Sequence, residues 1–179
     1  MAPSKNVRAI VELARSWPEQ MFVLAGPAWG DSKKLHDELA ETMPNLRVLL
    51  GISDAEKAWL LQHCRAFLFP SLTEGFGLPP IEAMYFGTPV FLSDRTSLPE
   101  VGGEQAGYFS DFSAAAMRSV LETELPRLQA SREATRRRAR TFTWERCVAD
   151  YAALYGSLLG GDGSSFAADL PSSMSVSAR

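Results

Sequence analysis

Short apolar runs alternate with amphipathic stretches along this chain, and this alternation limits its fold more than any other feature. Runs typical of buried strands recur at residues 21–26, 46–51, 66–70 and 89–92. Apolar residues at helical spacing lie before and between these runs, at 7–15, 30–43, 53–64 and 79–87. This order predicts a parallel sheet with helices on both faces, an α/β fold of the Rossmann-like three-layer α/β/α sandwich type.

The rest of the chain is predicted to be mostly helical. A short helix at 98–103 and an edge strand at 107–110 precede three helices, which we expect at Ala114–Leu125, from about Leu125 to Arg140, and at Trp144–Leu159. In the helix at 53–64 we expect Trp59, Leu60 and Leu61 to form the buried face. Residues 1–159 are therefore predicted to form one domain, and the tail 160–179, rich in Gly, Ser and Ala, to be a mobile end.

Composition excludes several classes of function. A formal net charge of −3 over 179 residues gives no overall attraction to nucleic acid. No run of eighteen apolar residues occurs and the start lacks an apolar signal core, so the sequence predicts a soluble, cytoplasmic protein. Cys64 and Cys147 lack metal-ligand spacing and are expected to be buried free thiols. We expect neither a metal nor a cofactor.

The stretch "TEGFGLPPIEAM", residues 73–84, is the strongest candidate for a site. Gly75 and Gly77 let backbone N–H groups approach a ligand, and the helix that follows favours an anion such as a diphosphate at its start. Glu82 in that helix is suited to accept hydrogen bonds from a ribose, and Glu74 from hydroxyls at the other end of the ligand. Such a set suits a nucleotide sugar. The residues alone leave open that Glu74 only caps a turn and that Glu82 only solvates its helix.

The region "SLTEGFGLPPIEAMYFGTPVFLSDRTSLPEVGG" resembles the signature region of the retaining GT-B glycosyltransferases of family 4, with Glu74 and Glu82 as its E-x7-E element. Other segments resemble that family in the same order: "KN" before a helix, "VLAGPAWG", "VLLGISD" and the late "FTWE". The resemblance covers roughly residues 5 to 158. It implies the second, donor-binding half of a GT-B fold.

The resemblance also implies roles for individual residues. Glu74, the catalytic candidate, would contact the transferred sugar, Glu82 would hold the donor ribose, and Lys5 would neutralise the diphosphate. The backbone of Phe76, Gly77 and Leu78 would meet sugar and phosphate, the base would lie at Gly51, Ile52 and Ser53, and Ser71 and Thr73 are weaker candidates. No metal is required by this design.

The implied function is transfer of a hexose, mannose-like by resemblance, from a GDP- or UDP-linked sugar to a glycan or lipid-linked acceptor. The family's acceptor half, its first donor-domain strand ending in "GR", and the arginine on that strand have no counterpart here. Neither His36 nor His63 matches the active-site histidine of the acceptor half. We therefore expect a donor-domain fragment that is inactive without its N-terminal acceptor domain.

Other interpretations stay open. The chain could be a non-catalytic nucleotide-sugar-binding or protein-interaction domain. A glycosidase with the two glutamates as acid and base, or a dehydrogenase, is disfavoured because an aromatic sugar platform and a GxGxxG motif are both missing. The arginines of residues 131–140 form either a solvated face or a peripheral contact with the anionic inner face of a membrane. An exposed apolar side of the helix at 144–159 would favour self-association.

Overall fold

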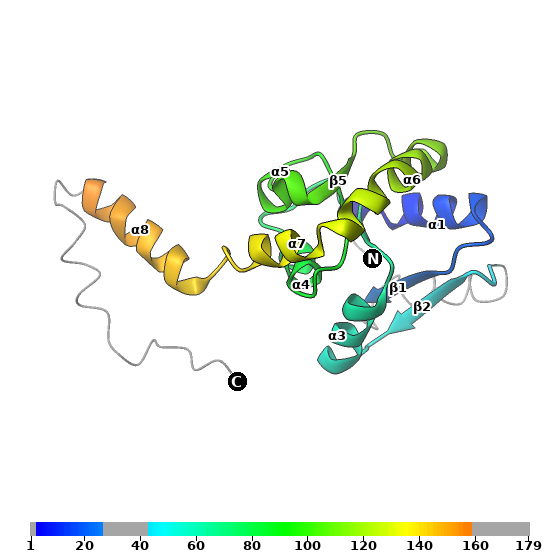
Figure 1. The fold of residues 1–179 in the computed structure, drawn as a ribbon, viewed down its shortest axis with the longest axis horizontal. Coiled ribbons are helices and arrows are strands. Elements are labelled where there is room, and N and C mark those ends of the chain that lie inside the picture. Colours follow the sequence, from blue (N-terminus) through cyan, green and yellow to red (C-terminus); the bar gives the residue numbers. More distant parts are fainter. Residues whose placement is uncertain (1–2, 27–42, 159–179) are drawn as a thin grey trace. The chain divides into compact units, whose positions relative to one another are not determined.

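The computed structural model describes residues 3–26 and 43–158 (Figure 1). The chain divides into two compact units, Met1–Ala139 and Arg140–Arg179. The first unit carries the short 3-10 helices η1 (Pro3–Lys5) and η2 (Gly103–Gln105) and strands β1 (Phe22–Gly26), β2 (Leu46–Leu50), β3 (Phe67–Phe69), β4 (Val90–Ser93) and β5 (Ala106–Phe109). Its α-helices are α1 (Val7–Ser16), α3 (Asp54–His63), α4 (Leu78–Tyr85), α5 (Leu98–Gly102), α6 (Ala114–Ala130) and α7 (Arg132–Ala139), and the second unit carries α8 (Trp144–Leu158).

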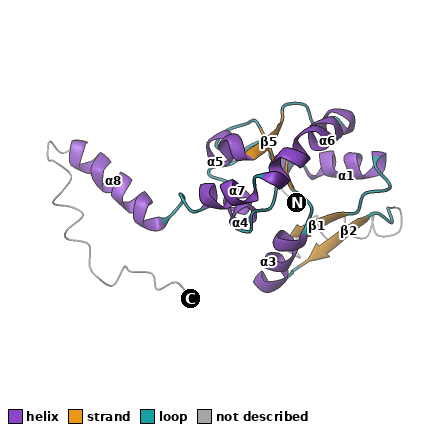
Figure 2. Ribbon diagram, in the orientation of Figure 1, coloured by secondary structure: helices purple, strands orange, loops and turns teal. Residues whose placement is uncertain are grey.

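Every described strand pair is parallel, as the alternation predicts. Figure 2 draws the strands in orange, with β1 and β2 side by side. The strands form two sheets, in the orders β1-β2 and β3-β4-β5, instead of one continuous sheet. Among the described residues, β1 and β3 therefore each keep one edge without a strand partner.

Two apolar cores lie on opposite faces of β4, because successive side chains of a strand point to opposite faces. Phe91 packs into a core with residues of α1 and α6, whereas Val90 and Leu92 pack into a core with residues of α4 and α5. All four residues of β4 are buried. Helices thus cover both faces of the central strand, which confirms the predicted three-layer sandwich.

The predicted elements agree with the structure except in a few places. The boundary between the first two C-terminal helices lies at Ser131, not near Leu125, since α6 continues through Pro126. Burial of Leu121, Leu125 and Leu128 along one face of α6 explains this continuation despite the N–H that the proline lacks. The helix predicted at 30–43 falls almost wholly on residues 27–42, which lie outside the described residues, as does His36. The whole tail 160–179, with its predicted mobility, also lies outside them.

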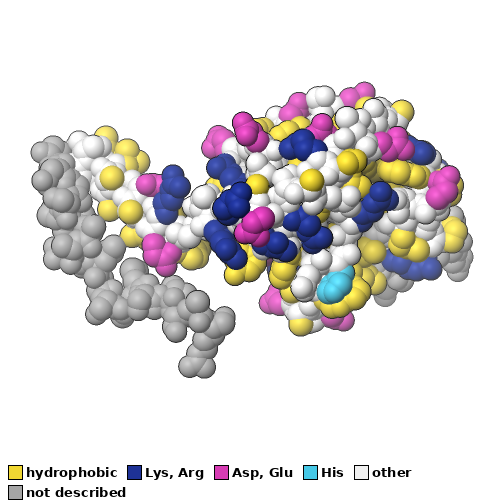
Figure 3. All heavy atoms as spheres, viewed as in Figure 1, with side chains coloured by type: hydrophobic (Ala, Val, Ile, Leu, Met, Phe, Trp, Pro, Cys, Tyr) yellow, Lys and Arg dark blue, Asp and Glu magenta, His cyan; other side chains and the backbone are white. Residues whose placement is uncertain are grey.

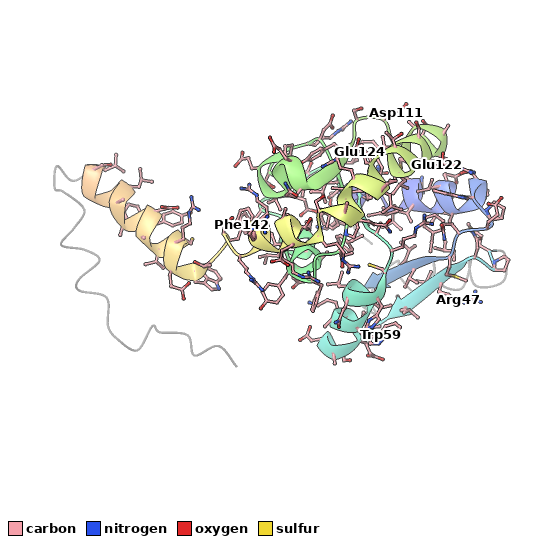
Figure 4. All side chains as sticks on the ribbon, in the orientation of Figure 1. Arg47, Trp59, Asp111, Glu122, Glu124 and Phe142 are labelled. Carbon is pink, nitrogen blue, oxygen red and sulfur yellow. The ribbon has the colours of Figure 1, made fainter. Side chains whose placement is uncertain are left out.

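The buried face expected for α3 is wrong in part. Leu61 is buried, but Trp59 is 60% exposed and stacks on the ring of His63 with the centroids 4.4 Å apart. Figure 4 shows Trp59 on α3. Cys64 and Cys147 are free thiols as expected, yet each is only partly buried.

The arginines of α7 have structural roles in part. Arg136 donates to the carbonyl of Phe86 just past the end of α4, and Arg138 donates to the carbonyls of Glu100 and Val101 in α5. Basic side chains gather over α7 in Figure 3. Two of these arginines therefore satisfy backbone oxygens at the ends of neighbouring helices, where carbonyls lack intrahelical partners.

Helix α8 has an apolar side that is exposed, as the sequence allowed. Trp144, Tyr151, Leu154, Tyr155 and Leu158 are each more than half exposed. Across the described residues, no helix is both long and apolar enough to cross a bilayer.

Candidate functional site

The candidate site is built on the loop between β3 and α4, at the carboxyl end of β3. Gly77 directly precedes α4 with φ +107°, a conformation that side chains disfavour. A Cβ on Gly77 would also lie 2.9 Å from Cδ2 of Leu98. At Gly75, by contrast, a Cβ would meet nothing within 4 Å. Gly77 is therefore required by the fold of the loop, while Gly75 borders open space that a ligand can enter.

Two prolines restrict which N–H groups this site offers. Among the first four residues of α4, Pro79 and Pro80 have no N–H, so only Leu78 and Ile81 keep one. Anion binding at this helix start must therefore depend mainly on the loop amides from Gly75 to Leu78.

The N-terminal segment is fastened to this loop. The carbonyl of Ser4 accepts hydrogen bonds from the N–H of Leu72 at 2.7 Å and from the hydroxyl of Ser71 at 2.9 Å. Ser71 is fully buried, so its hydroxyl serves this attachment, whereas Thr73 is exposed. The attachment holds the next residue, Lys5, beside the loop.

Lys5 and Glu74, predicted to act on the same ligand, lie in contact. Nζ of Lys5 is 2.5 Å from Oε1 of Glu74 and 5.2 Å from the centroid of the Phe69 ring. The Glu74 side chain is only 11% exposed, while that of Lys5 is 42% exposed. An ammonium group has three N–H donors, so Lys5 can bind Glu74 and a phosphate oxygen together.

The second predicted carboxylate, Glu82, pairs with a lysine that sequence reasoning missed. Nζ of Lys57 in α3 lies 3.1 Å from Oε1 of Glu82 and 3.5 Å from Oδ1 of Asp54. The hydrogen bond to Glu82 raises the pKa of Lys57 above its ordinary value. The spacing of Asp54 and Lys57 favours an ion pair between these two residues on one helix face, but it does not predict the contact with Glu82. Glu74 and Glu82 thus each form an ion pair with a lysine that is distant in the sequence.

The segment predicted to hold the base follows β2. Gly51 has φ +64° and donates its N–H to the carbonyl of Gly26 at 2.9 Å. The Ser53 hydroxyl accepts from the Glu56 N–H, and the Glu56 carboxylate accepts from the Ser53 N–H at 2.8 Å; these two bonds form a capping box at the start of α3. The hydroxyl also donates to the Glu56 carboxylate at 2.7 Å. The Ser53 side chain therefore stabilises the start of α3.

Ile52 lines a shallow, mainly apolar pocket of about 270 Å³. The other residues around this pocket are Leu49, Glu56, Trp59 and Leu60. The hydrogen bonds from Ser53 lower the pKa of Glu56 below its ordinary value. A flat apolar group with polar edges suits such a surface.

The structure thus places the predicted residues in three groups. Lys5, Glu74 and the glycine loop form one, Glu82, which pairs with Lys57, forms the second, and Gly51–Ser53 after β2 form the third. Phe76 and Leu78 are 48% and 61% exposed beside the loop. Within residues 3–26 and 43–158, no group of three or more His, Cys, Asp or Glu side chains is placed to hold a metal ion.

Comparison with known proteins points to one family. The family model "Glycosyl transferases group 1" matches residues 1–141. O-antigen chain mannosyltransferase B of Escherichia coli is 32% identical over 161 residues, which are 83% of this chain and 42% of that protein. GDP-mannose-dependent alpha-(1-6)-phosphatidylinositol dimannoside mannosyltransferase of Mycobacterium tuberculosis is 32% identical over 156 residues, 86% of this chain and 40% of that protein. The chain therefore spans less than half the length of these relatives.

Solved structures agree with this assignment. TarM has a TM-score of 0.69 at 18% identity, and the match covers 87% of this chain and 33% of TarM. The pneumococcal O-GlcNAc transferase GtfA in complex with UDP and GlcNAc has a TM-score of 0.65 at 20% identity, covering 88% of this chain and 34% of that one. These similarities establish the Rossmann-like fold of a GT-B glycosyltransferase domain. Because the family model matches residues 1–141, most of this chain, the chain belongs to the glycosyl transferases group 1 family.

Proposed function

We propose that the chain is the donor-binding half of a retaining glycosyltransferase of family 4. The enzyme would transfer a hexose from a nucleoside-diphosphate sugar to a glycan or lipid-linked acceptor. A separate N-terminal domain would hold the acceptor, and this half alone would be inactive.

One observation carries this proposal: the contact between Lys5 and Glu74 at the glycine loop. The two residues are 69 positions apart, and they meet where β3 ends. In an open parallel sheet, ligands bind outside the carboxyl ends of the strands. A cation for phosphate and a carboxylate for hydroxyls therefore stand together where a nucleotide sugar is expected.

In this proposal, different residues bind different parts of the nucleotide sugar. Lys5 and the amides from Gly75 to Leu78 bind the diphosphate, and Glu82, oriented by Lys57, accepts hydrogen bonds from the ribose. The base lies against Gly51, Ile52 and the start of α3 at Ser53.

At the other end of the donor, Glu74 contacts the transferred hexose, beside Phe76. Cleavage of the bond from the sugar to the diphosphate leaves negative charge on the phosphate oxygen. Lys5 and the loop amides stabilise that charge where it develops, which lowers the barrier to transfer. The proposal requires no metal or cofactor.

Mannose, carried by GDP, is the proposed donor sugar. Several relatives are named as mannosyltransferases, and one of them as GDP-mannose-dependent. A UDP-linked sugar is the second candidate, because GtfA was solved with UDP.

We also propose a further strand in the sheet of the donor-binding domain. An additional parallel strand between β1 and β3 would satisfy the free edge that each of them has.

Two surfaces are proposed to make further contacts. Exposed arginines of α7, such as Arg132 and Arg137, are proposed to contact an anionic membrane surface. The apolar side of α8 is proposed to mediate self-association.

Calorimetric titration of the 179-residue chain tests the proposed function. We expect saturable binding of GDP-mannose, weaker binding of UDP-glucose and ADP-glucose, and no dependence on added Mg²⁺. Saturable binding of none of the three sugar nucleotides, by a chain shown to be folded by circular dichroism, would contradict the assignment of this site.

A further inference from the structure

The loop after β4 contacts the glycine loop at three successive residues. The hydroxyl of Thr96 accepts a hydrogen bond from the N–H of Glu74 at 3.2 Å. The hydroxyl of Ser97 donates to the carbonyl of Phe76 at 2.9 Å, with the carbonyl of Glu74 at 3.3 Å. The next residue, Leu98, packs against the α-carbon of Gly77. One face of the glycine loop is therefore covered by this segment.

Two features of this segment depart from ordinary local preference. Thr96 has φ +53°, which is unfavourable for a β-branched residue by about 1–3 kcal/mol. Ser97 precedes α5 but makes no side-chain cap to it, although serine is among the best capping residues. Both hydroxyls are turned to the glycine loop. The unfavourable backbone conformation of Thr96 and the missing cap of Ser97 therefore accompany contacts with the proposed donor site.

These contacts fix the direction of a peptide group. All described peptide bonds are trans, and in a trans peptide the carbonyl of one residue and the N–H of the next point in opposite directions. The Phe76 carbonyl points to Ser97, so the Gly77 N–H points away from Ser97. The segment after β4 contacts the Ser97 side of the loop, and the Gly77 N–H points to the opposite side.

We propose that Ser97 is a positioning residue for donor binding, which keeps the Phe76 carbonyl away from the diphosphate and presents the Gly77 N–H to it. This inference rests on the proposed function. A carbonyl oxygen turned to the ligand side would repel the diphosphate, whereas an N–H binds it. Thr96 supports the arrangement by holding the Glu74 N–H on the same covered face.

The test compares Ser97→Ala with Ser97→Thr in the full 179-residue chain, titrated with GDP and with GMP. We expect Ser97→Ala to weaken the binding of GDP by about three- to tenfold, the usual effect of losing one hydrogen bond. The binding of GMP should weaken by less than twofold. Ser97→Thr keeps a hydroxyl and should retain GDP affinity. Ser113→Ala is the matched control, because Ser113 precedes α6 and also lacks a side-chain cap. Equal weakening of GDP and GMP, or none, would overturn the proposal.

A second measurement needs no ligand. Residual dipolar couplings report the direction of the Gly77 N–H in the free chain, and we expect this direction to change in Ser97→Ala but not in Ser113→Ala. An unchanged direction would overturn the positioning role. If the wild type binds no nucleotide, the proposed function fails and the role in donor binding fails with it, while the couplings still decide whether Ser97 orients the peptide.

Discussion

Replacing Phe91 by alanine is expected to lower the free energy of unfolding of the unit Met1–Ala139 by about 3–5 kcal/mol, the usual effect for a buried phenylalanine. Phe91 lies in the central strand β4, is fully buried, and stacks on Phe109 with the ring centroids 6.0 Å apart. Its partner in β5 is Gly107, where an added Cβ would lie 2.6 Å from the ring. The ring therefore fills the space that glycine leaves.

Urea unfolding followed by circular dichroism measures this change. Met21→Ala is the control, because Met21 is 56% exposed and its loss should change the free energy of unfolding by less than about 0.5 kcal/mol. Similar changes for both variants would contradict the described core.

Replacing Glu82 by alanine is expected to weaken binding of the donor nucleotide by about 10- to 100-fold, since a hydrogen bond to a charged group contributes about 1.5–3 kcal/mol. In the proposed complex the carboxylate accepts from the ribose hydroxyls. In the free chain it pairs with Lys57, and both side chains are about two-fifths exposed, so loss of this pair alone should affect stability little.

Glu122→Ala is the matched control for Glu82→Ala. Glu122 is a half-exposed carboxylate of α6, labelled in Figure 4, and pairs with Arg118 as Glu82 pairs with Lys57. Its removal should leave nucleotide affinity unchanged. Equal affinities for wild type and Glu82→Ala in calorimetric titration would remove Glu82 from the proposed site.

Much of the fold could be predicted because its signals are local. The apolar runs predicted β1 to β5, and apolar residues at helical spacing predicted α1, α3 and α4. The division into two sheets is not local, because it depends on which strands are adjacent in space. The exposure of Trp59 was missed for a related reason. Helical spacing predicts which residues share one face of a helix, but it does not predict whether another element packs on that face.

The site was predicted in part. Gly77 and the placement of Glu74 in a strand-to-helix loop followed from residue type and spacing. Lys57 and Ser97 could not be assigned roles from sequence, because each acts on a residue 25 or 21 positions away. The contact of Lys5 with Glu74 likewise depends on how Ser4 is bound to the loop after β3.

Amide chemical-shift mapping tests the proposed location of the donor site. We would titrate the ¹⁵N-labelled chain with GDP-mannose and follow each backbone N–H. We predict the largest shifts at Glu74–Leu78 and Gly51–Ser53, with little change around the shallow cavity lined by Trp17, which directly follows α1, and by Leu121 of α6. Saturable shifts confined to that cavity, or to α7, would place the nucleotide elsewhere and rule out the proposed donor site.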